Sequence, residues 1–187
     1  MGTYITVGTS FPKKPLLTSK ATRWFEGVDH SHVYITWKDG LGLRWVAEAH
    51  GSGIRVISNV EFKMKNRVIN LYKYNCSQDG HDAAIKWMWA HSHLSYAFMQ
   101  LYGLFEMRVL GLMCRFFKMK CKPKNRFANG AYSQICTEFV LRALDVATEG
   151  RLDIPEDVEN FGLYETSLFN KANGELLPQE MIDRINS

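Results

Sequence analysis

The sequence predicts an α+β fold, in which an antiparallel β-sheet meander from the first half of the chain packs against helices from the second half. Two patterns predict it. Up to about residue 75, short segments of alternating apolar and polar residues follow one another, separated by glycine-containing turns. From about residue 79, apolar residues recur at helical spacing and turn-forming residues become rare. Closely spaced strands of this kind are typical of an antiparallel meander.

A short helix ending at Gly27 is expected between the first two strands. The second strand has the clearest pattern, because Val33 and Ile35 face one side while His32 faces the other. The expected strands cover residues 4–8, 31–37, 43–50, 54–62 and 67–75.

The stretch LSYAFMQLYGLFEMRVLGLMCRFF, residues 94–117, is long enough to cross a lipid bilayer. Three polar or charged residues interrupt it, namely Gln100, Glu106 and Arg108, and each would be costly in hydrocarbon. We therefore expect a buried helix or helix pair here and no transmembrane segment.

A basic loop follows this stretch, and then apolar residues from Ile135 to Leu144 mark one face of a helix that ends near Gly150. The tail, residues 153–187, is expected to be loop-like with a short final helix. No repeat, low-complexity segment or linker is visible, so residues 1–187 are expected to form a single domain.

The composition is that of an ordinary globular protein: 187 residues, 46% hydrophobic, 22% charged, with a net charge of +4. These values argue against a disordered chain, a collagen-like chain or a disulfide scaffold. No signal peptide is visible, which favours a cytoplasmic location. The four cysteines form no C-x-x-C pair, and we expect free thiols in a reducing compartment.

Cys136 is a candidate nucleophile because it lies where a polar loop enters a helix. The first turn of a helix offers N–H donors and a dipole that favours a thiolate. The charge around it has the right sign, since residues 107–137 contain seven Lys or Arg residues and no Asp or Glu.

His32 is the candidate base, and Glu48 is the group that would orient it. If the second and third strands form a hairpin, Glu48 can lie beside His32 and hold its imidazole in one tautomer. Cys136, His32 and Glu48 would then supply a nucleophile, a base and an orienting group. His30 remains an alternative base, and His50 an alternative third residue.

Four segments, taken in order, resemble the circularly permuted NlpC-type papain-like cysteine hydrolases, the group related to lecithin retinol acyltransferase. In that group the histidine strand comes first and the cysteine helix comes late. The segment LSYAFMQLYGLF lacks the Asp of its family counterpart, and CTEFV has Thr137 and Phe139 where the family has Ser and Leu. The resemblance covers roughly residues 4–165, in the segments TSKATRWFEGVDHSHVYITW, WVAEAHGSGIRV, LSYAFMQLYGLF and YSQICTEFVLRAL.

The resemblance implies a permuted papain-like fold in which Cys136 is the nucleophile at a helix N-terminus, His32 the general base and Glu48 the third member. Glu138, next to the nucleophile in the motif, is expected to make structural hydrogen bonds. No metal or other cofactor is expected. The candidate substrate contacts are Tyr34, His50 and Tyr132.

The expected function is that of a thiol hydrolase cleaving an amide through a Cys acyl-enzyme, in a peptide or isopeptide such as those of peptidoglycan. One alternative is a thioesterase or acyltransferase acting on lipid acyl groups. Another is a non-catalytic assembly subunit that keeps the fold, for example in a phage virion. Residues 115–126 form a basic stretch that suits an acidic partner, and nucleic-acid binding is not expected.

Overall fold

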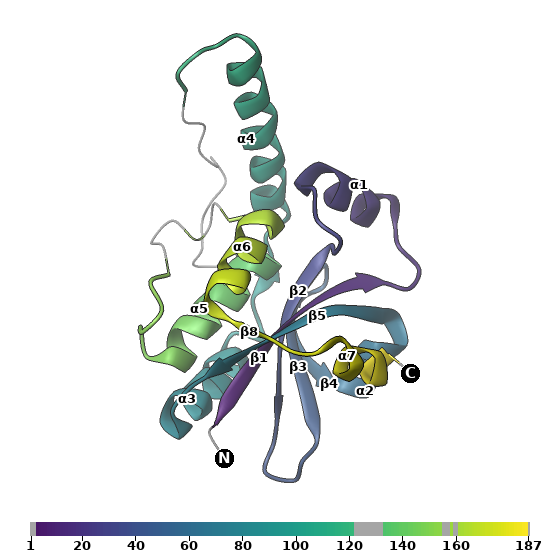
Figure 1. The fold of residues 1–187 in the computed structure, drawn as a ribbon, viewed down its shortest axis with the longest axis vertical. Coiled ribbons are helices and arrows are strands. Elements are labelled where there is room, and N and C mark those ends of the chain that lie inside the picture. Colours follow the sequence, from purple (N-terminus) through teal and green to yellow (C-terminus); the bar gives the residue numbers. More distant parts are fainter. Residues whose placement is uncertain (1–2, 122–132, 155–157, 159–160, 187) are drawn as a thin grey trace.

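The fold is known from a computed structural model, which describes residues 3–121, 133–154, 158 and 161–186. Their main feature is a six-stranded antiparallel sheet in the order β4-β3-β2-β1-β5-β8 (Figure 1). A parallel pair, β6 with β7, forms a second, two-stranded sheet. The strands are β1 (Tyr4–Pro12), β2 (His32–Lys38), β3 (Arg44–His50), β4 (Gly53–Ser58), β5 (Asn66–Asn75), β6 (Ser95–Tyr96), β7 (Ser133–Gln134) and β8 (Glu175–Leu176).

Helices cover both faces of the sheet, which confirms the predicted α+β class. One core lies between the sheet and helices α3 and α5, and a smaller core lies between the opposite face and helices α2 and α7. The helices are α1 (Leu17–Glu26), α2 (Asn59–Lys65), α3 (Gln78–Ala90), α4 (Phe98–Phe116), α5 (Cys136–Thr148), α6 (Leu163–Asn173) and α7 (Gln179–Asn186).

The alternation predicted for β2 separates these two cores. Val33 and Ile35 are fully buried in the larger core, on the side of α5. Tyr34, between them in sequence, enters the smaller core and packs on Phe62 of α2 with ring centroids 4.3 Å apart. Residues of opposite parity are thus buried on opposite faces, as a two-sided sheet requires.

Three expectations about secondary structure were wrong. The strand expected over 54–62 ends at Ser58, because its side chain accepts a hydrogen bond from the N–H of Glu61 and caps α2. The tail holds a full helix, α6, whose Glu165 side chain accepts from the N–H of Gly162. Strand β5 does not continue the meander beside β4 but returns to pair with β1.

Residues 98–116 form one helix, α4, which projects beyond the sheet (Figure 1). The expectation of a buried helix or helix pair was wrong, because only its base packs into the body, through Gln100 and Leu104. Across the described parts of the chain, no helix combines the length and the apolar character needed to span a bilayer.

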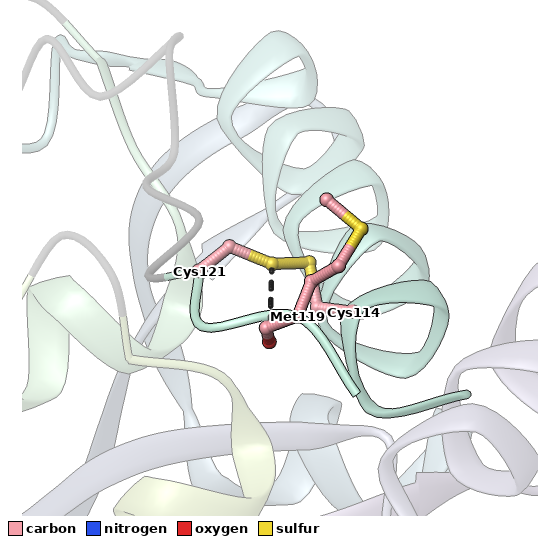
Figure 2. The surroundings of a disulfide bond; sticks show 3 residues. All are labelled: Cys114, Met119 and Cys121. Atoms are coloured by element: carbon pink, nitrogen blue, oxygen red, sulfur yellow. Dashed lines mark hydrogen bonds between the residues drawn. A yellow bond between two sulfur atoms is a disulfide. The ribbon is translucent and has the colours of Figure 1, made fainter. Parts of the chain in front are cut away.

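Cys114 and Cys121 form a disulfide at the far end of α4 (Figure 2). The expectation of free thiols was wrong for these two residues. The chain turns back after the helix, with Lys118 in a left-handed conformation, and this brings the two Cα atoms to 6.2 Å. Cys76 and Cys136 are free.

The close approach of β1 and β2 gives a test of the packing. Gly8 pairs with Tyr34 across the two strands, and a Cβ atom at Gly8 would overlap the Tyr34 ring. Because Phe62 holds that ring in place, Gly8→Ala should lower the free energy of unfolding by about 1–3 kcal/mol, measured by urea denaturation. Gly40→Ala is the matched control, since nothing lies within 4 Å of its Cβ position. Equal effects of the two changes would contradict this packing.

Candidate functional site

Cys136 is the first residue of α5, and it is only 7% exposed. The helix is held by its apolar face, where Phe139, Val140 and Leu144 are fully buried against the sheet. Ile135, the residue before the helix, is extended, and within the described residues no side chain caps the first turn there. The first backbone N–H groups of α5 therefore remain available to a negative charge beside Cys136.

His32 lies at the start of β2, where it contacts two functional groups. Its Nε2 atom lies 2.6 Å from Oε2 of Glu48 on the neighbouring strand β3. The imidazole also makes a hydrogen bond with the Cys136 side chain. Because Nε2 is used by the carboxylate, Nδ1 is the ring atom left for the sulfur. The prediction that Glu48 lies beside His32 is therefore confirmed.

Glu48 is 1% exposed and accepts hydrogen bonds on both oxygens. Its second oxygen, Oε1, accepts hydrogen bonds from Nε of Arg55 at 2.8 Å and from Nη2 of the same residue at 2.5 Å. Arg55 lies directly across from Glu48 in the β3–β4 register. The arginine therefore holds the carboxylate in place, and the carboxylate holds the imidazole.

These contacts shift the pKa of both members of the pair. Burial acts to lower the pKa of His32, but hydrogen bonds and negative charge from Cys136 and Glu48 outweigh it and raise the pKa to about 10. Burial acts to raise the pKa of Glu48, yet its hydrogen bond to His32 and the charges of His32 and Arg55 lower it to about 2. At neutral pH the pair therefore favours an imidazolium on His32 hydrogen-bonded to a carboxylate on Glu48.

Tyr96 is a second contact of the Cys136 side chain, and the sequence did not predict it. Burial raises the pKa of Tyr96, and the charge and hydrogen bond of Cys136 raise it further, so the phenol stays protonated and donates toward the sulfur. The β6–β7 pairing explains its position, since Tyr96 lies opposite Gln134, two residues before Cys136. A pairing of two-residue strands leaves no periodic signal in the sequence.

Glu138 has the structural role that was predicted for it. Its carboxylate is fully buried and accepts from Nε2 of Gln100 at 2.9 Å and from Nε of Arg142 at 2.8 Å. These bonds connect the first turn of α5 to the base of α4. The neighbouring Thr137 donates its hydroxyl to the carbonyl of Phe161 at 2.7 Å.

The two histidine alternatives occupy other environments. His30 precedes β2 rather than sharing its face, is 1% exposed, and has Nδ1 2.8 Å from Asp29. Burial lowers the pKa of His30, even though Asp29 opposes that shift. His50 is exposed, and its Nδ1 lies 3.2 Å from the hydroxyl of Ser52. The geometry therefore favours His32 as the base and Glu48 as its partner.

The three residues predicted to contact a substrate differ in where they lie. Tyr34 is buried in the smaller core against Gly8 and Phe62, so the expectation that it touches a substrate does not fit its position. His50 is exposed at the end of β3 and stays a candidate. Tyr132 lies outside the described residues.

Comparisons with known proteins leave the site to be interpreted from its chemistry. No protein-family model matches the chain, and no curated protein matches it either. Within the described ranges, no group of three His, Cys, Asp or Glu side chains is placed to hold a metal ion.

The pairing of His32 and Glu48 predicts a specific pH dependence of stability. Because the pKa of His32 is raised, the imidazole adds to the free energy of unfolding. That contribution is complete below pH 6.5, its ordinary pKa, and is lost as the pH rises through about 10. Because the pKa of Glu48 is lowered, the carboxylate also adds to the free energy of unfolding. That contribution is complete above pH 4.5, its ordinary pKa, and is lost as the pH falls through about 2. The stability difference between wild type and Glu48→Gln should therefore be greatest between pH 4.5 and 6.5, at about 3 kcal/mol.

Urea denaturation across the pH range measures this difference. Asp153→Asn is the control, because Asp153 is exposed and its replacement should change stability little at any pH. A Glu48→Gln effect of constant size from acid to alkaline pH would contradict the assigned coupling.

Proposed function

We propose that this protein is a thiol hydrolase that cleaves an amide bond, of a peptide or isopeptide, through an acyl-enzyme on Cys136. The observation that carries the proposal is the position of His32, whose ring contacts both the Cys136 sulfur and the buried carboxylate of Glu48. A nucleophile, a proton carrier and an orienting carboxylate are the parts that this chemistry needs. The order of the histidine strand and the cysteine helix also suits a permuted papain-like frame.

In the first half-reaction, the Cys136 thiolate attacks the carbonyl carbon of the amide. The oxyanion that forms is stabilised by the N–H groups at the start of α5 and by the hydroxyl of Tyr96. His32 then gives its proton to the leaving nitrogen as the C–N bond breaks. The products are a free amine and a thioester on Cys136.

In the second half-reaction, water attacks the thioester carbonyl and His32 takes up its proton. The C–S bond breaks, the carboxylic acid leaves, and the thiolate is restored beside an imidazolium. Glu48 acts throughout as the positioning residue, because its bond to Nε2 keeps Nδ1 directed at the sulfur.

Acyl transfer or thioester hydrolysis is the second candidate, since it shares the first covalent step. The observation that favours it is an exposed apolar side chain beside the site. The ring of Phe98, 59% exposed, packs on Tyr96 at a centroid distance of 4.9 Å. Turnover of peptide nitroanilides and peptidoglycan would support the amidase, and turnover of long-chain nitrophenyl esters alone would favour the second candidate.

Iodoacetamide labelling tests the nucleophile directly. At pH 7, Cys136 should react roughly thirtyfold faster than an ordinary thiol, because an ordinary thiol is only a few per cent thiolate at that pH. His32→Ala should remove the difference. The rate is followed by mass spectrometry of the labelled peptides.

Cys76 is the internal control for this experiment. It is free and half-buried, and burial raises its pKa, so it should label slowly. Cys76→Ser should leave the fast phase intact, and Cys136→Ala should abolish it. A Cys136 no faster than Cys76, or unaffected by His32→Ala, would favour a non-catalytic subunit that keeps the fold.

The hydroxyl of Tyr96 can be tested separately from the thiolate. Tyr96→Phe should lower the turnover of p-nitrophenyl acetate by about 10²–10³-fold, the usual cost of losing one oxyanion donor. The iodoacetamide rate should change far less, because alkylation forms no oxyanion. Tyr164→Phe, at a half-exposed site on α6, is the control. Full turnover in Tyr96→Phe would exclude the donor role.

A further inference from the structure

Helix α4 carries a row of exposed apolar side chains along its whole length. Their spacing of four, three, seven and four residues places them on one face of the helix. The described chain leaves this face largely uncovered, since each of the five is between 51% and 82% exposed. We define the apolar stripe by these residues: Phe98, Tyr102, Phe105, Leu112 and Phe116.

The apolar surface continues from α4 onto α1. Phe25 of α1 packs on Phe105 with ring centroids 4.7 Å apart, so the two helices lie side by side at this point. A cavity of about 660 Å³ opens between them, lined in part by Trp24 and Met119. Trp24 is 85% exposed, and Leu17 is 82% exposed. Exposed apolar side chains that run together over two neighbouring helices indicate a surface that meets something other than water.

The charge at the far end of α4 has a single sign. Three exposed cations, Arg115, Lys118 and Lys120, lie at the end of the helix and in the turn that follows it. The disulfide of Cys114 and Cys121 ties that turn to the helix (Figure 2). No Asp or Glu occurs anywhere in residues 107–137. The apolar stripe therefore ends in a segment of the chain whose charged residues are all basic.

We propose that the apolar stripe and these three cations dock the protein on an anionic lipid bilayer. The stripe would lie in the plane of the membrane, with its aromatic and aliphatic side chains at the boundary between head groups and acyl chains. The cations would meet the lipid phosphates, and the attraction would depend on anionic lipid and on salt.

The charge of this face favours an anionic bilayer over the two other partners that an exposed apolar helix suggests, a second copy of the chain and a nucleic acid. A second copy of the chain would bring the same cations to the interface without acidic residues from 107–137 to balance them. A nucleic acid would match the cations, but its phosphate backbone gains nothing from Leu112 or Phe116. An anionic bilayer satisfies both the apolar and the charged parts.

The base of α4 sets how the docked surface relates to Cys136. Arg108 pairs with Glu165 of α6 and lies 3.7 Å from Glu26 of α1, so the lower half of the helix is held on the body. Phe98, the first residue of the stripe, packs on Tyr96, which contacts Cys136. The membrane would then begin next to the candidate site. The docking itself does not depend on the proposed function.

Vesicle co-sedimentation of the full chain tests the proposal, with phosphatidylcholine vesicles that contain or lack phosphatidylglycerol. Wild type should bind the anionic vesicles and release them at high salt. Leu112→Ser with Phe116→Ser should weaken binding at least about tenfold, because two large apolar side chains no longer enter the lipid. Arg115→Gln, Lys118→Gln and Lys120→Gln together should weaken it roughly a hundredfold, at about fivefold per charge.

Matched variants on the body keep the test specific. The first control variant, Leu41→Ser with Val60→Ser, removes two exposed apolar side chains far from α4 in sequence. The second combines Lys38→Gln, Lys65→Gln and Lys86→Gln and removes three exposed cations. Both should bind like wild type. Every variant should keep its circular dichroism spectrum and its Cys136 labelling rate, which separates loss of docking from loss of the site.

Four outcomes would overturn the proposal. The first is binding that ignores phosphatidylglycerol, and the second is full binding by the stripe variant. The third is a dimer in light scattering that the stripe variant dissociates, which would assign the face to self-association. Tight binding of an oligonucleotide that needs the cations but not Leu112 and Phe116, without vesicle binding, would assign it to nucleic acid.

Discussion

The site depends on one buried ionic arrangement, the Glu48 carboxylate held between His32 and Arg55. Taking a carboxylate out of water is costly unless each oxygen has a partner, and removing one partner of a buried pair costs about 3–5 kcal/mol. Here each oxygen has one, His32 on Oε2 and Arg55 on Oε1. The three residues come from three adjacent strands, so the pairing also favours the register of β2, β3 and β4. A slip by one residue would turn Glu48 to the other face of the sheet.

The sulfur is brought to this arrangement by packing rather than by charge. Helix α5 is buried along its apolar face, and Glu138 connects its first turn to Gln100 and Arg142. Cys136 is therefore placed by a rigid element at the end of the sheet. Tyr96 reaches the same sulfur through the short β6–β7 pairing. Preorganised donors of this kind are worth more in a water-poor site than in solvent.

Helix α4 contrasts with this rigid centre. The buried side of its base shares contacts with the site, while one face of the helix keeps an apolar stripe in water and its far end carries positive charge. Exposure of that size carries a free-energy cost that a lipid surface would remove. A site next to such a surface would act at the boundary between membrane and water, whether its substrate is an amide or a lipid acyl group.

The sequence by itself determined the features that depend on near neighbours along the chain. The period-two pattern predicted the strands, the β2–β3 hairpin predicted Glu48 beside His32, and the helical period placed Cys136 at a helix start. Only the tertiary structure decided that His32 rather than His30 meets the sulfur, and that Tyr96 joins it. The reason is physical: those contacts depend on how strands and a helix far apart in sequence pack together, and residues 95–96 carry no local pattern that records their pairing with 133–134. The disulfide of Cys114 and Cys121 was missed for a different reason: the two cysteines are close in sequence, but only a turn with Lys118 in a left-handed conformation brings them together.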